Sequence, residues 1–136
     1  MTSKIAHLQM IQAVVSRLAQ NSFLLKGWSV LLISASFALA SRDTDLAFIY
    51  LAYLPVVSFW LLDAYYLRQE KLFRALHDLV RETDEADIDY SMSTESVGPE
   101  VEPLGSVAVS STILGFHLPL LGAVIIVMIV AIVEPL

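Results

Sequence analysis

Apolar and polar positions divide the chain into three long apolar runs separated by polar stretches. The runs cover residues 21–40, 46–67 and 111–134, and the first is continuous if Lys26 extends to the membrane surface. A helix needs about 20 apolar residues to cross a bilayer. The pattern therefore predicts an all-α membrane protein with three transmembrane helices.

The polar segments flanking the first two runs indicate that these helices continue beyond the bilayer. Apolar residues recur at 3-4-3 spacing within residues 1–20, which is typical of a packed helix continuous with the first span. A second amphipathic helix is expected over residues 68–87. Only residues 41–45 separate the first two spans, and so short a loop joins neighbouring antiparallel helices. We therefore predict a long hairpin that extends from the bilayer into the cytoplasm.

The turn position predicts which residues lie at equal depth in this hairpin. If the chain turns near residues 44–45, residues at equal depth have numbers that sum to about 89, as Lys26 and Asp63 do. Isolated charges near the hydrocarbon are costly, so we predict that Lys26 and Asp63 form a structural ion pair. The same relation matches two other opposite charges, Lys4 with Glu85 and Arg17 with Glu70.

A heptad frame runs from the N-terminal helix into the first span. It places Ser22, Ser29 and Ser36 at one seam position, and Leu25, Leu32 and Leu39 at the other. Small polar residues let helices approach closely in lipid and form hydrogen bonds across the contact. The serine stripe is interpreted first as a packing face inside the hairpin, and second as the lining of a polar path through an oligomer.

The composition fits a membrane protein, and its charges predict the orientation. Hydrophobic residues make up 57% of the 136 residues and charged residues only 16%, which excludes an ordinary soluble domain. Seven of the eight Lys and Arg residues flank the N-terminal side of span one or the C-terminal side of span two. The positive-inside rule thus predicts a multi-pass protein with its N-terminus and residues 68–110 cytoplasmic and loop 41–45 external.

The connector between spans two and three carries the excess of acidic residues that gives the chain its net charge of −6. Residues 82–104 contain eight acidic residues and no Lys or Arg, and Gly and Pro residues predict an irregular connector over 88–110. Three interpretations are a solvated linker, a docking site for a basic partner, or a vestibule that concentrates cations around an oligomeric pore. The residues assigned to partner docking are Asp84, Glu85, Asp87 and Asp89.

Candidate chemistry within the spans is sparse. His117, followed by Pro119 in span three, is interpreted as an interfacial residue bonded to a neighbour or, alternatively, as a constriction that responds to protons or cations. The three histidines lack the spacing of a helical metal site, and the chain has no cysteine. No phosphate-binding loop, hydrolase motif or basic aromatic patch occurs. We therefore expect no enzyme activity, metal, cofactor or nucleic acid.

Two blocks, residues 21–28 (NSFLLKGW) and 59–74 (FWLLDAYYLRQEKLFR), resemble a group of small bacterial multi-span membrane proteins. The layout of a helical hairpin with a long cytoplasmic extension is also similar to the SLATT-type two-span effectors of bacterial conflict systems. That resemblance implies oligomerisation and permeabilisation of the inner membrane once a partner senses phage infection. The third span is a departure from the two-span plan, and the resemblance supplies no catalytic residue.

Two functions follow as hypotheses. The first is a homo-oligomeric effector that forms a pore or perturbs the membrane when triggered from the cytoplasmic side, in phage defence if the resemblance holds. The second is a non-conducting anchor or accessory subunit that recruits a cytoplasmic protein through the paired helices and the acidic connector.

Overall fold

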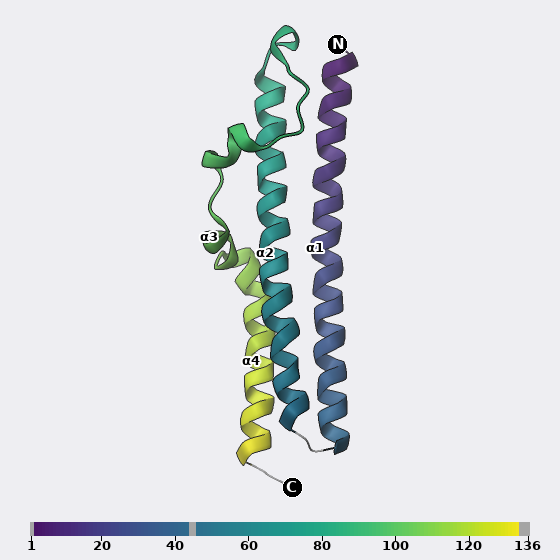
Figure 1. The fold of residues 1–136 in the computed structure, drawn as a ribbon, viewed down its shortest axis with the longest axis vertical. Helices are drawn as coiled ribbons and strands as arrows, with labels where there is room; N and C mark the ends of the chain where they lie inside the picture. The colour runs from purple at the N-terminus through teal and green to yellow at the C-terminus, as the bar shows by residue number, and fades with distance from the viewer. Residues whose placement is uncertain (1, 44–45, 134–136) are drawn as a thin grey trace.

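The fold is an antiparallel pair of very long helices with a shorter helix packed against one end. A computed structural model describes residues 2–43 and 46–133. Helix α1 (Thr2–Asp43) and helix α2 (Leu46–Glu82) lie side by side along most of their lengths, and α4 (Ser111–Val133) packs on α2 near the turn (Figure 1). The predicted all-α class and the first two paired helices are confirmed, and the described residues contain no strand.

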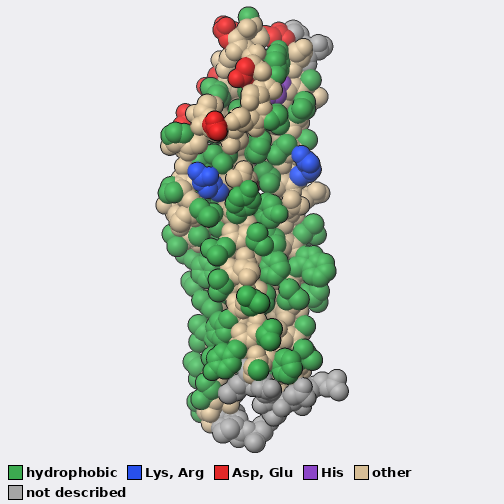
Figure 2. Space-filling model, in the orientation of Figure 1, with side chains coloured by type: hydrophobic (Ala, Val, Ile, Leu, Met, Phe, Trp, Pro, Cys, Tyr) green, Lys and Arg blue, Asp and Glu red, His purple; other side chains and the backbone are tan. Residues whose placement is uncertain are grey.

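Three of these helices are long and apolar enough to cross a membrane, namely α1, α2 and α4. In Figure 2 hydrophobic side chains cover the half of the molecule nearest the turn, whereas acidic side chains gather at the opposite end. We call that opposite end, made of residues 2–20 and 68–82, the open end of the hairpin. The distribution is the one expected if the half nearest the turn lies in a bilayer.

Two apolar clusters hold the hairpin, one at its open end and one nearer the turn. At the open end Ile11 packs with Leu72, Leu76 and Val80, all buried. Nearer the turn a second cluster joins α1, α2 and α4 through Ile33, Ala52, Val56 and Val124. Helix α1 contributes to both clusters because it is one uninterrupted helix.

The strict heptad frame is wrong at its second position in the apolar half of α1. Leu32 and Leu39 are exposed, and the buried residues are Ile33 and Ala40, each one position later. An α-helix has 3.6 residues per turn, so its contact face drifts by about 20° per heptad from a repeat of 3.5. Over several heptads this drift moves the seam by one residue.

The C-terminal ends of α1 and α2 both differ from the prediction. Helix α1 continues to Asp43, so residues 41–43 of the predicted loop 41–45 are helical, while residues 44–45 lie outside the described residues. Helix α2 ends at Glu82 rather than at residue 87. Acidic side chains are unfavourable at a helix C-terminus. Lys4 Nζ instead donates to the carbonyls of Arg81 and Thr83, at 3.0 and 2.8 Å, and so satisfies the last turn.

The connector folds back along α2 instead of extending into solvent. It contains three short helices, η1 (Glu85–Asp87), η2 (Glu95–Glu100) and α3 (Leu104–Ala108) (Figure 1). Residues 88–94 are irregular as predicted, whereas η2 and α3 lie within the range 88–110 that was expected to be irregular throughout. Val97, only 1% exposed, packs in the open-end seam, with Ile88, Met92 and Val101 against it. The connector is thus docked on the hairpin through these spaced apolar residues, while most of its acidic side chains stay exposed to solvent.

Candidate functional site

Four polar side chains from three helices meet in the apolar part of the fold. Asp63 of α2 accepts from Lys26 Nζ and from His117 Nε2, each at 2.7 Å from its Oδ2 atom. The Ser22 hydroxyl donates to Asp63 Oδ1, and Lys26 Nζ also donates to Ser22 Oγ at 2.9 Å. We call these residues the buried polar cluster. The ion pair that the hairpin register predicts is present.

The cluster is sealed from solvent mainly on its carboxylate and imidazole side. The side chains of Asp63 and His117 are 0% exposed, whereas that of Lys26 is 25% exposed. Trp60 stacks on His117 at 6.0 Å between ring centroids, and Lys26 Nζ lies 5.7 Å from the Phe116 ring centroid. The Trp60 indole donates to the carbonyl of Ala108 at 2.9 Å, which holds the end of α3 beside the cluster, just before α4 begins.

The cluster lies at the end of the apolar half that is farther from the turn. Asp63 is 17 residues beyond Leu46, and a rise of 1.5 Å per residue places it about 26 Å from the turn. A hydrocarbon core is about 30 Å thick. If the turn lies at one surface of the bilayer, the cluster therefore lies just inside the opposite surface.

The buried polar cluster connects three helices through one carboxylate. Asp63 is the shared acceptor for α1 through Lys26 and Ser22, and for α4 through His117. A buried carboxylate without partners is costly, so α4 is retained where its imidazole satisfies Asp63. His117 is fully buried and bonded to a neighbour, as the first interpretation expects. Helix α4 continues through Pro119.

The serine stripe is not a uniform face. Ser22 belongs to the cluster, and Ser29 is fully buried without a hydrogen-bond partner among the described residues. Ser36 donates to the carbonyl of Leu32 on its own helix. Ser22 and Ser29 thus serve close packing within one chain, and neither is free to line a path between chains in this conformation.

The other two predicted equal-depth contacts have different outcomes. Glu70 binds Arg74 one turn along α2 at 3.0 Å rather than reaching Arg17. Lys4 donates to two backbone carbonyls at the end of α2, and it lies near enough to Glu85 to contribute to the lowered pKa of that carboxyl. The register therefore identifies the neighbourhood of Lys4 and Glu85, whereas Glu70 has a nearer partner on its own helix.

Sequence reasoning missed the contact between His117 and Asp63, and it missed Trp60 as its cover. The register rule applies only to helices joined by a tight turn, and α4 follows a connector of many residues. The available signal was that His117 and Asp63 are both ionisable residues within apolar runs, where isolated charges are costly.

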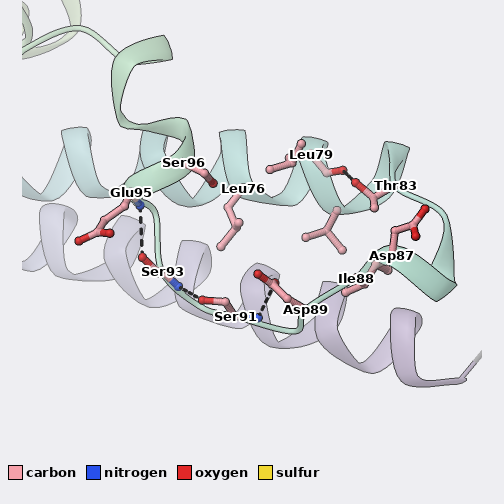
Figure 3. A pocket seen from close by; sticks show the side chains of 11 residues that line it. Leu76, Leu79, Thr83, Asp87, Ile88, Asp89, Ser91, Ser93, Glu95 and Ser96 are labelled. Atoms are coloured by element: carbon pink, nitrogen blue, oxygen red, sulfur yellow. Dashed lines mark hydrogen bonds between the residues drawn. The ribbon is translucent and has the colours of Figure 1, made fainter.

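The acidic residues assigned to docking lie at the open end, far from this cluster. Asp84 is exposed and Glu85 half-buried, while Asp87 and Asp89 line a pocket between α2 and the connector (Figure 3). Among the described residues, no group of three His, Asp or Glu side chains is close enough together to hold a metal ion.

The fold and the cluster together define a class: an α-helical protein whose three long apolar helices are able to span a membrane. Comparison of the chain with protein-family models, with curated proteins and with solved structures finds no match. The function is therefore argued from the residues alone.

Proposed function

We propose that this protein is a non-conducting membrane subunit, with its open end in the cytoplasm, that anchors a soluble partner at the bacterial inner membrane. One observation carries the proposal: the ionisable side chains of the buried polar cluster contact one another inside a single chain. Lys26 and His117 both bond to Asp63, and Ser29 is buried. A conducting path needs polar groups along a continuous surface.

The outward faces support the same proposal. The exposed residues of α4 in its last three turns are aliphatic, among them Ile126, Ile129 and Val130. Such a surface is suited to acyl chains and offers nothing to stabilise water or ions. The open end, by contrast, holds the docked connector, whose carboxylates remain accessible to a protein in solution.

A second candidate is the closed state of a homo-oligomeric effector that permeabilises the membrane after a cytoplasmic trigger, in phage defence. A specific observation favours it: α4 buries little of its surface, and its His117 imidazole is held by Asp63. Breaking that contact would free α4 from the hairpin and expose Asp63. The trigger would then act on the connector, which leads directly into α4.

Membrane potential distinguishes the two candidates. The protein is expressed in bacteria alone, with the products of its chromosomal neighbours, and as the variant His117→Leu, and a potential-sensitive dye is followed. The anchor predicts an unchanged potential in all three cases, and a stable complex with a neighbour's product on purification. Depolarisation with a neighbour present or in His117→Leu, absent in the matched variant Ile126→Leu on the lipid-facing side, would contradict the anchor and support the effector.

A further inference from the structure

A pocket of about 390 Å³ lies between the end of α2 and the connector at the open end (Figure 3). Its floor is apolar and consists of Leu76, Leu79, Val80 and Ile88. Leu76 points from α2 into the space, and the connector backbone closes the other side. The volume falls at the lower end of the range of ligand pockets, which is enough for a few side chains of a peptide.

The polar rim of this pocket carries one sign of charge. Asp87, Asp89 and Glu95 line it, and no Lys or Arg does. Among the described residues, the carboxylates of Asp87 and Glu95 have no ion-pair partner, and Asp89 Oδ1 accepts only from the backbone N–H of Ser91, at 3.0 Å. An apolar floor beneath unpaired carboxylates is complementary to an apolar group joined to a cation.

The rim is also held in place by its own hydrogen bonds. The N–H groups of Ser93 and Glu95 donate to the hydroxyls of Ser91 and Ser93, at 3.0 and 3.3 Å (Figure 3). Tyr90 has a φ of 58°, a left-handed conformation that is strained for a bulky residue. Leu79 remains 45% exposed on the floor, although it lies beyond the apolar half of the fold.

We propose that this pocket binds a short segment of a partner protein in which a Leu-like side chain lies next to a Lys or Arg. This inference rests on the proposed anchoring function and names the chemistry by which the partner is recognised. Leu79 is 16 residues beyond Asp63, or about 24 Å along α2. The polar layer of a bilayer adds only about 5–8 Å beyond the hydrocarbon, so the pocket lies past the lipid headgroups and a protein is its occupant.

The test measures binding of a defined peptide to the full chain in phosphatidylcholine nanodiscs. The probe is a fluorescein-labelled hexapeptide of alternating Leu and Arg, followed by anisotropy, with empty nanodiscs and an alternating Leu-Glu peptide as controls. Wild-type protein should bind the Leu-Arg probe saturably and more tightly than empty nanodiscs do. The Leu-Glu peptide should not bind, because the rim repels it.

Two double variants separate the pocket from the general acidity of the connector. Asp87→Asn with Glu95→Gln removes two rim charges while keeping side-chain shape, and should weaken binding about fivefold. Leu79→Ser should also weaken binding. Asp84→Asn with Glu100→Gln removes two exposed charges of the same connector outside the pocket and should leave binding unchanged. Equal weakening by both double variants, or no binding above empty nanodiscs, would overturn the proposal.

Failure of the pocket is distinguishable from failure of the anchoring function. If the neighbour's product copurifies with both the wild-type protein and Asp87→Asn/Glu95→Gln while the membrane potential stays unchanged, the anchor stands and the pocket proposal is wrong. If the membrane depolarises, the anchoring function is wrong whatever the probe does.

Discussion

The contact between Lys26 and Asp63 predicts a specific pattern of stability in paired substitutions. Lys26→Met leaves the fully buried Asp63 carboxylate with only Ser22 and His117. Removing one partner of a buried pair costs about 3–5 kcal/mol, and the two remaining hydrogen bonds lower the expected loss to about 2–3 kcal/mol. Asp63→Asn leaves Lys26, which is 25% exposed and able to reach the membrane surface, so we expect a loss of about 1–2 kcal/mol.

The double variant retains neither charge and should be more stable than Lys26→Met. We expect a loss of about 1 kcal/mol, and thus a coupling of about 2–4 kcal/mol between the two positions. Unfolding is measured in dodecylmaltoside by titration with SDS, with the fluorescence of Trp60 as the signal in a Trp28→Phe background. Trp60 stacks on His117 and therefore reports on the cluster itself.

A second cycle on Lys71 and Glu102 is the matched control. Their side chains lie 2.8 Å apart and are partly exposed, and exposed pairs contribute at most about 1 kcal/mol. A coupling at Lys26 and Asp63 no larger than this control, or a double variant whose loss equals the sum of the single losses, would refute the argument that the buried charges depend on each other.

Three further predictions concern the packing and orientation of the chain. Tyr53 Oη lies 3.4 Å from Met128 Sδ, and the chain has no cysteine, so a short bismaleimide should join the pair Tyr53→Cys/Met128→Cys. The exposed pair Tyr50→Cys/Ile126→Cys should not be joined. Equal yields of cross-linked protein would contradict the packing of α4 on α2. Val97→Ser should weaken docking of the connector on the hairpin by about 2 kcal/mol and so speed proteolysis of the connector about thirtyfold. The control Val109→Ser should have little effect, because Val109 is 63% exposed. A cysteine at position 93 should react with an impermeant maleimide only in permeabilised cells and one at position 41 in intact cells, and the reverse pattern would invert the orientation.

The pairing of the first two helices was predictable because its determinants are local. A five-residue break, an apolar periodicity and charges at matching distances from the turn are all visible in one stretch of sequence. These features place Lys26 opposite Asp63 without knowledge of any other part of the chain. The error at Leu32 and Leu39 arose from treating an α-helix as a strict heptad, which it follows only when it supercoils.

The packing position of α4 and the fold of the connector were not predictable in the same way. Which residue of α4 meets Asp63 depends on how residues 83–110 fold, and their few apolar side chains, such as Val97, are dispersed among acids and turn residues. Their burial is a property of the hairpin surface that they cover. The sequence nevertheless marked Asp63 and His117 as costly in a membrane, and that cost is relieved by their mutual contact.

Planar-bilayer recording of the purified protein measures whether the chain conducts when its buried polar cluster is enclosed. A non-conducting subunit should give no current above that of protein-free bilayers, over voltages of both signs and at several protein-to-lipid ratios. Discrete current steps that disappear on substitution of Ser29 or Ser36 by Leu would contradict this expectation, because they would show that the serine stripe lines a conducting path.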